Sequence, residues 1–496
     1  MRITLAAILL SAHAALAAPD IVLAIGGEPE TGFDPILGWG GYGNPLFQST
    51  LLKRGPDLET QADLATDWVL SDDRLVWTLT LREGVKFSDG TALTAQDVAF
   101  TFNTAKAAAG TVDLDVMRSA EALDPRTVRI VLDRPWITFT EAFFTLGIVP
   151  RTYGPGYGRN PIGSGPYRLV SWREGEQLIV APNPHYHGPR APFGQITFLF
   201  TGEDTGLAAA RAGQVQMVAV PAQLADAVPP GFRAVPVRTV DSRGLSLPMQ
   251  GPVTGDPAIR RAMNLGLDRD LLVDVALMGH GTPAFGPADG LPWAGKDDRV
   301  DFDTEAAMDV LDAAGWTPGT DGIRARDGVR ASFAVNYPAG DSTRQALAET
   351  AAELLRPLGI EATPKGGSWD AIGRVMGAEP VVFGFGSHSP YQIYSLFAER
   401  LGGVEYMNPS HYANPAVDAL FEQAQGAESL DASYAAWSQA ADHYGVRGDN
   451  SWLWLANLDH VYLVDDCLDI GRPGIEPHGH GWPITAGIAD WRWTCE

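Results

Sequence analysis

The sequence predicts an α/β protein of at least two lobes, and three observations lead to this fold class. The chain has 496 residues, which is too many for one hydrophobic core. Strand, loop and helix patterns alternate in its second half, which favours α/β lobes with mostly parallel strands. A Pro- and Gly-rich stretch near residue 250, LSLPMQGPVTGDP, separates this half from the first.

The first 17 residues, MRITLAAILLSAHAALA, have the features of a secretory signal peptide. A basic residue precedes a short apolar run, and Ala15-Leu16-Ala17 fits an A-x-A cleavage site. The run is shorter than the roughly 18 residues that a spanning helix needs, and no cysteine follows it for lipid attachment. We therefore expect residues 1–17 to be removed and the mature protein to be soluble and periplasmic.

The elements of the first half follow from periodicity and turn signals. After a short apolar strand at 20–27, residues 75–81 alternate between apolar and polar, as in a half-buried strand. The turn SDGT follows, and Thr94 and Asp97 form a capping-box pattern that opens a helix. Further strands are expected at 126–132, 165–172 and 177–183.

The second half contains the α/β alternation. Residues 258–277 form a strongly periodic pattern, read as one helix with Ala262, Leu265, Leu272 and Val275 inward, and a second helix at 305–316 is stopped by Gly315. A strand at 332–337, a helix with a capping box at Ser342 and Gln345, and a strand from Ile360 come next. The order repeats with a strand over 381–385 and a helix from about Pro390.

Charge and cysteine content narrow the function. The net charge of −24 repels phosphate backbones and anionic membranes, so a nucleic-acid partner is not expected. The only two cysteines, Cys467 and Cys495, could pair in an oxidising compartment and close the segment that contains PHGHGW.

Several segments make the chain similar to a known family. LREGVKFSDGTALTAQDVAFTF, NPIGSGPYRLVSW, DPAIRRAMNLGLDRDLL and the AAGW helix end resemble the extracytoplasmic solute-binding proteins of family 5, which serve ABC importers for peptides and nickel. The resemblance implies the two-lobed periplasmic binding protein fold, class II of the peptide/nickel-binding type, with a hinge and an interlobe cleft. It implies a large lobe of residues 18–249 and 466–496, with a subdomain around 50–180, and a small inserted lobe of 250–465.

The finer resemblance is to the nickel-binding branch, through IEPHGHGWP, SWLWLANLDHVYLV and GFGSHSPYQIY. It implies a monomer that captures a nickel or related transition-metal chelate, with a small chelator or amino acid such as histidine, and delivers it to ABC importer permease subunits. The alternative is an oligopeptide- or dipeptide-binding protein of an ABC importer, because the family also carries peptides and opines.

His478 and His480 are the candidate metal ligands. Residues two apart on an extended chain point to the same side, so H-x-H can present two imidazoles to one ion. Neutral imidazole suits nickel, copper and zinc. The alternative is a surface loop with solvated histidines. Two imidazoles alone would hold a metal weakly, so a chelator must supply the other ligands.

Arg344 is the candidate carboxylate clamp. It lies between the strand SFAVNY and its helix, where open parallel sheets bind ligands, and a guanidinium there can bind a carboxylate bidentately. The alternative is a surface arginine paired with an acid. His388 and Tyr391 follow the next strand on the same rim, and His388 is either a ligand contact or a satisfied loop histidine.

Four glycine-framed aromatics complete the expected ligand-binding set. Such residues on loops often wall ligand pockets, although many of the 14 tryptophans must belong to the core. They are Trp39, Tyr42, Trp369 and Trp482.

Catalysis and covalent cofactors are not expected. The chain has no Walker loop and no C-x-x-C, and its GSGPY lacks the G-x-S-x-G frame. A metal hydrolase built on H-x-H would need further ligands and a general base, for which the sequence offers no set. We therefore predict a binding protein with no catalytic residues, whose bound chelate is its cargo.

Overall fold

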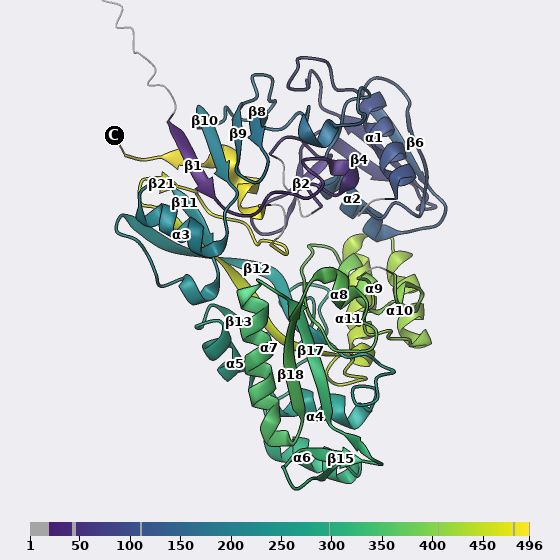
Figure 1. Cartoon of the computed structure of the whole chain (residues 1–496). Coiled ribbons are helices and arrows are strands. Elements are labelled where there is room, and N and C mark those ends of the chain that lie inside the picture. The colour runs from purple at the N-terminus through teal and green to yellow at the C-terminus, as the bar shows by residue number, and fades with distance from the viewer. Residues whose placement is uncertain are drawn as a thin grey trace, which may run out of the picture.

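The computed structural model describes residues 19–41, 46–109, 112–296, 298–404, 406–479 and 482–495. Its elements gather into an upper and a lower lobe, and the first described strand, β1 (Asp20–Ala24), lies close to the C-terminal segment in the upper one (Figure 1). Two long strands run from one lobe into the other: β12 (Phe232–Ser246) and β20 (Trp452–Asp465). In the described part of the chain, no helix is long and apolar enough to cross a membrane.

A mixed sheet of nine strands extends through both lobes. Its longest pair, β12 with β20, is antiparallel, and the register shifts between Arg238 and Ser242 and again before Gly244. Such bulges bend a strand and re-aim its side chains. The strand order is β19 (Val382–Phe385), β12, β20, β11 (Met217–Val220), β1 (Asp20–Ala24), β10 (Gln195–Leu199), β9 (Gln177–Pro182) and β8 (Tyr167–Arg173), and β13 (Gly281–Pro283) pairs with β20.

A second, antiparallel sheet forms the N-terminal subdomain of the upper lobe. The burial of its strand β5 (Val76–Leu81) alternates as its sequence predicts. Helix α1 (Ala95–Ala108) packs on this sheet and begins with the predicted capping box, in which the Thr94 N–H donates to the Asp97 carboxylate over 2.9 Å. The sheet order is β4 (Ala65–Leu70), β5, β7 (Thr127–Leu132) and β6 (Met117–Ala122). The hairpin β2 (Leu52–Arg54) and β3 (Thr60–Ala62), with helix α2 (Glu141–Thr145), lies beside it, and α3 (Glu203–Arg211) packs on β11.

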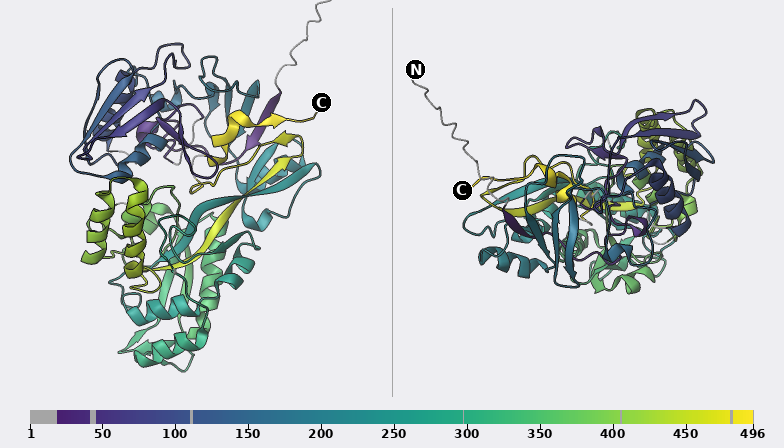
Figure 2. Two further views of the ribbon diagram at one scale, coloured as in Figure 1. Left: turned by 180° about the vertical axis from the view of Figure 1, so that it is seen from behind. Right: turned by 90° about the horizontal axis from the view of Figure 1, so that it is seen from above.

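The lower lobe is rich in helices. Strands β17 (Ser332–Pro338) and β18 (Glu361–Gly367) are parallel, and α7 (Ser342–Leu355) connects them and packs on both. Helices α10 (Pro415–Gln425) and α11 (Leu430–Tyr444) pack together directly beneath the N-terminal subdomain (Figure 2). The other elements are α4 (Pro257–Gly266), α5 (Arg269–Ala276), α6 (Thr304–Ala313), α8 (Trp369–Gly373), α9 (Tyr391–Phe397), β14 (Thr317–Pro318), β15 (Arg324–Arg326) and β16 (Val329–Arg330).

The C-terminal segment returns to the upper lobe and is tied there. Cys467 and Cys495 form the disulfide that the compartment argument favoured. Beside it, β21 (Leu468–Asp469) pairs with β22 (Arg492–Trp493). The bridge thus closes a loop that carries His478 toward the middle of the molecule.

The prediction of one continuous helix over residues 258–277 is wrong. Residues 258–277 form two helices, α4 and α5, because Asp268 caps a new helix by accepting from the Leu271 N–H over 2.9 Å. The interruption resets the helical phase. Val275, predicted to face inward, is therefore 55% exposed, whereas Val273 is buried.

Two smaller predictions also differ from the structure. The cap of α7 is Asp341 rather than Ser342, since the Asp341 carboxylate accepts from the Arg344 N–H over 2.8 Å. The strands are not mostly parallel: among the described strand pairs, only β1 with β10, β1 with β11, and β17 with β18 are parallel.

Candidate functional site

Two neighbouring cavities lie in the cleft between the lobes. One has a volume of ≈ 280 Å³ and the other ≈ 320 Å³. Both are lined by Glu141 and Thr145 of the upper lobe and by Ser387 of the lower lobe. The cleft is therefore divided into two adjoining compartments of a size that suits a small molecule.

Arg344 lies at the first turn of α7, and β17 leads into it. Only 7% of the residue is exposed, and its guanidinium forms an ion pair with Asp341. The guanidinium also lies 5.7 Å from the ring centroid of Trp369. Trp369 in turn contacts Tyr406, which lines the larger cavity, with ring centroids 5.4 Å apart. Arg344, Trp369 and Tyr406 thus form one wall of the lower lobe, and of these three only Tyr406 is among the described residues that line the two cavities.

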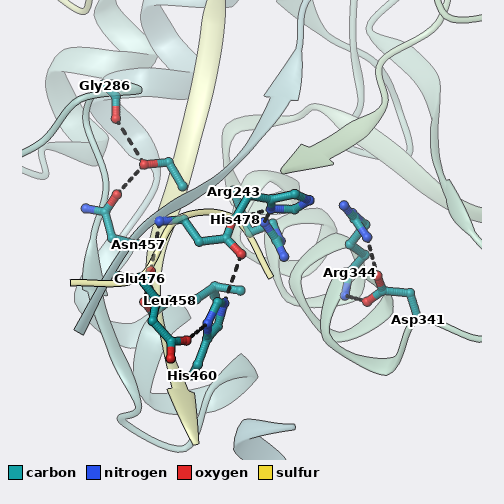
Figure 3. A network of polar contacts seen from close by, with 12 residues as sticks. Arg243, Gly286, Asp341, Arg344, Asn457, Leu458, His460, Glu476 and His478 are labelled. Atoms are coloured by element: carbon teal, nitrogen blue, oxygen red, sulfur yellow. Dashed lines mark hydrogen bonds and ion pairs between the residues drawn. The ribbon is translucent and has the colours of Figure 1, made fainter. Parts of the chain in front are cut away.

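Arg243 is a second buried cation beside Arg344. It is 7% exposed and forms an ion pair with Asp241 at the bulge of β12. Burial and the nearby Arg344 charge lower the pKa of Arg243, although Asp241 opposes this shift. Figure 3 shows Arg344 beside Arg243 and His478, with no hydrogen bond or ion pair drawn between the two arginines. In the described part of the chain, the Nε atoms of both arginines have no hydrogen-bond partner.

Asp241 connects Arg243 to a histidine–carboxylate chain, whose members His478, His460 and Glu476 are labelled in Figure 3. Its carboxylate lies 2.8 Å from His478 Nδ1 and 3.3 Å from His460 Nε2. Burial disfavours its ionised form, but Arg243, His478 and His460 outweigh burial and hold the pKa of Asp241 well below its usual value. The opposite nitrogen of His460 lies 2.6 Å from the Glu476 carboxylate.

His460 carries a positive charge in this chain of contacts. Burial lowers its pKa, but the bonds to Asp241 and Glu476 outweigh burial and raise the pKa of His460 to about 9. Two carboxylates therefore face two cations, Arg243 and His460, inside the protein. Pairing of this kind is what permits charges to be buried at all.

His478 is buried rather than solvated, with 5% of the residue exposed. Its backbone N–H donates to Gly386 over 3.0 Å, and its Nδ1 lies 3.0 Å from Arg243 Nη1. Close packing surrounds the ring, because a Cβ on Gly384 would lie 2.7 Å from His478 Cε1. His480, the other predicted metal ligand, lies outside the described residues. Among those described, no group of three or more His, Cys, Asp or Glu side chains could hold a metal ion.

His388 and Tyr391 line different compartments. His388 lines the smaller cavity, where burial and the nearby Arg54 charge lower its pKa to about 3, so the ring is neutral. Its Nε2 has no hydrogen-bond partner among the described residues. Tyr391 lines the larger cavity, and its hydroxyl hydrogen-bonds the carboxylate of Asp113.

Trp39 and Trp482 lie apart from this wall. They are 5% and 3% exposed, and their ring centroids are 5.6 Å apart within an aromatic cluster of the upper lobe. Trp482 stacks on Phe198 at 4.6 Å. Neither tryptophan occurs among the described residues that line the two cavities. Tyr42 lies outside the described residues.

Sequence reasoning missed Asp241, Arg243, His460 and Glu476. A signal was present for His460, which is followed by the apolar run 461–464 of β20, whereas Asp241 and Arg243 lie in a largely polar stretch of β12. Charged groups inside such strands need partners across the sheet. Glu476 gave no comparable signal, since it lies in the irregular segment before His478.

Comparison with known proteins identifies the family. Residues 59–400 match the bacterial extracellular solute-binding proteins, family 5, middle region. The chain belongs to this family. Protein XP55 of Streptomyces lividans is 37% identical over 476 residues, which cover 91% of this chain and 86% of that protein. The glutathione-binding protein GsiB of Salmonella typhimurium is 28% identical over 333 residues, or 62% of this chain and 64% of GsiB.

Solved structures share the two-lobed fold. NikZ from Campylobacter jejuni in complex with Ni(L-His) has a TM-score of 0.85 at 21% identity and covers 96% of this chain and all of NikZ. The oligopeptide-binding protein AppA from Bacillus subtilis, in complex with a nonapeptide, has a TM-score of 0.77 at 22% identity and covers 96% of this chain and 99% of AppA. This likeness confirms the predicted two-lobed periplasmic binding protein fold. The family is one of solute-binding proteins that work with ABC importer permeases.

Proposed function

We propose that this protein captures a nickel or related transition-metal chelate, with a small amino-acid-like chelator, in the periplasm for an ABC importer. The observation that carries the proposal is the pair of buried arginines, Arg243 and Arg344. Each retains an unpartnered Nε–H, and each guanidinium already has one carboxylate partner. A further carboxylate between them would satisfy both donors with charge-assisted hydrogen bonds.

The metal would lie beside this anion site. His478 contacts Arg243, and His480 follows two residues later. Imidazole ligands for the metal and a guanidinium for the chelator carboxylate would therefore lie close together. The chelator must supply the remaining metal ligands, because two imidazoles alone bind weakly. A likeness in fold to NikZ with Ni(L-His) supports the same class of cargo. Closure of the lobes would then bury the chelate and form the surface that the permease recognises.

Isothermal titration of the purified mature protein tests the proposal. Nickel with L-histidine should bind, and Arg344→Ala should weaken binding at least about tenfold, equivalent to about 1.4 kcal/mol. Gln345→Ala, next along the same helix, changes an exposed side chain and serves as the control. Native mass spectrometry of protein isolated from its own periplasm should show the mass of a metal plus chelator. Unchanged binding by Arg344→Ala contradicts the clamp.

An oligopeptide is the second candidate cargo. The cleft has two adjoining compartments, and Asp113 and Tyr391 line the larger one. A short peptide could place its terminal carboxylate at the arginines and its amino group near Asp113. Likeness to AppA and GsiB supports this class. Glutathione and a tetrapeptide should therefore be titrated in parallel, and tight peptide binding without nickel–histidine binding would favour this candidate.

A further inference from the structure

The two lobes meet a second time, far from the strands β12 and β20 that connect them. Thr138, in a short 3-10 helix of the upper lobe (Ile137–Thr140), contacts Gln425 at the end of α10. The Thr138 N–H and Oγ1 both donate to Gln425 Oε1, over 3.2 and 2.8 Å. Both residues are buried, at 3% and 0% exposure. This polar contact joins positions 287 residues apart in the chain.

Aromatic and charged pairs surround this contact. Trp136 of the upper lobe packs edge-to-face on Tyr394 of α9, with ring centroids 5.2 Å apart. On the solvent side, Arg134 Nη1 lies 3.2 Å from Glu422, and both side chains are well exposed. The contacts thus grade from a buried hydrogen-bonded pair to an exposed ion pair.

Two residues of these contacts also line the larger cavity. Trp136 and Thr138 line it from the upper lobe, and Tyr391, which bonds Asp113 across the cleft, lines it from the lower lobe. Figure 2 shows the connecting strands on one side of the molecule, and α10 and α11 beneath the N-terminal subdomain on the other. The cavity therefore has a hinge on one side and these contacts on the other.

We propose that these contacts form a closure latch, defined by Thr138–Gln425, Trp136–Tyr394, Arg134–Glu422 and Asp113–Tyr391. None of them involves Arg243 or Arg344, and only Asp113–Tyr391 lies where a peptide cargo would bind. Their surroundings are apolar, since Ile137, Phe139, Phe421 and Trp437 share one core cluster across the lobes. The buried hydrogen bonds and this apolar contact favour one relative position of the lobes, because opening would exchange both for contacts with water. The latch therefore keeps a closed population even without cargo.

Distance measurement by pulsed electron resonance tests the latch. Spin labels on Arg118→Cys and Lys365→Cys occupy exposed positions in opposite lobes, and the chain's own cysteines are bonded to each other. Protein refolded from denaturant to remove cargo should show a closed and an open distance. Gln425→Ala should lower the closed-to-open ratio at least about threefold, and Gln345→Ala on the exposed face of α7 should leave it unchanged.

Two results would overturn the latch: a cargo-free wild type without a closed population, or a folded Gln425→Ala variant with the wild-type ratio. If Gln425→Ala does not fold, Glu422→Lys decides, because this exposed residue can change without loss of the core. At low salt, repulsion from Arg134 should lower the closed share, and 0.5 M salt should restore it by screening. An unchanged ratio at low salt would overturn the latch. None of these measurements uses cargo, so the latch and the proposed function fail independently.

Discussion

Asp241 is the residue at which the charges of the site converge. It is fully buried and contacts Arg243, His460 and His478. Asp241 and Arg243 lie two residues apart on β12, and residues two apart on a strand point to the same side, so this strand directs a carboxylate and a guanidinium into the same cluster. An ion-pair network at this depth is costly to disrupt, since removal of one partner leaves another charge uncompensated.

His460 should make the protein less stable as the pH becomes alkaline. Its folded pKa of about 9 exceeds the unfolded value of about 6.5. The stabilisation is therefore complete below pH 6.5 and is lost as pH rises through about 9, with a size on the order of 3 kcal/mol. Urea unfolding between pH 6 and 10 should show this decline. His460→Gln should flatten it, whereas the exposed His185→Gln should not; equal slopes in all three proteins would contradict the assignment.

His480 provides a second pH-dependent prediction, this time for binding. If it coordinates the metal of the chelate, binding should weaken as pH falls through about 6.5, because a protonated imidazole cannot coordinate. His480→Ala should reduce nickel binding in calorimetry with L-histidine present and leave the ligand-free melting temperature nearly unchanged. Wild-type binding by this variant would remove His480 from the site and favour the peptide cargo.

At the scale of elements, the break between α4 and α5 decides which side chains support the lower lobe. Leu272→Ala should cost about 2–5 kcal/mol because Leu272 is fully buried. Val275→Ala, three residues on, should change stability by less than about 0.5 kcal/mol because the residue is 55% exposed. Urea unfolding of the two variants checks this contrast. Similar losses of unfolding free energy in both would contradict the break and support one continuous helix.

The sequence predicted elements well wherever local chemistry decides them. The capping box at Thr94 and the stop at Gly315 follow from contacts within a few residues, and both are present in the structure. The break at Asp268 could not be predicted from periodicity, because the apolar pattern continues through it. The helix ends there because the Asp268 side chain caps the start of α5. Strand direction was missed for another reason: pairing partners such as β12 and β20 lie some 200 residues apart.

The candidate site was only partly within reach of the sequence. Arg344 and His388 follow strands, so the rule for parallel sheets indicated them, and the glycine frame indicated Trp369. In the structure His388 lines the smaller cavity, and Arg344 lies 5.7 Å from the ring centroid of Trp369 on the lower lobe. Asp241 and Arg243 lie inside a strand, where that rule expects packing rather than recognition. The glycine frame around Trp39 and Trp482 indicated pocket walls, but in the structure both rings pack in an aromatic core.

For the whole molecule, continuity of sheet and core predicts cooperative unfolding. The nine-stranded sheet passes through both lobes, and one apolar cluster contains residues of each. We expect a single urea transition, with far-UV circular dichroism and tryptophan fluorescence coinciding. Two separated transitions would show that the lobes are energetically independent despite their shared strands.

The bulged strand β12 also limits how this protein can evolve to bind another cargo. Asp241 and Arg243 belong to a strand that joins the lobes, so substitutions there disturb lobe movement together with recognition. Trp369 and Tyr406 lie on loops or short helices of one lobe, with 38% and 45% exposure. Substitutions that adapt the protein to new cargo should therefore accumulate at Trp369 and Tyr406. The charged residues of β12 should be retained among relatives that bind different cargo. Engineers who wish to retune the receptor should begin with the wall.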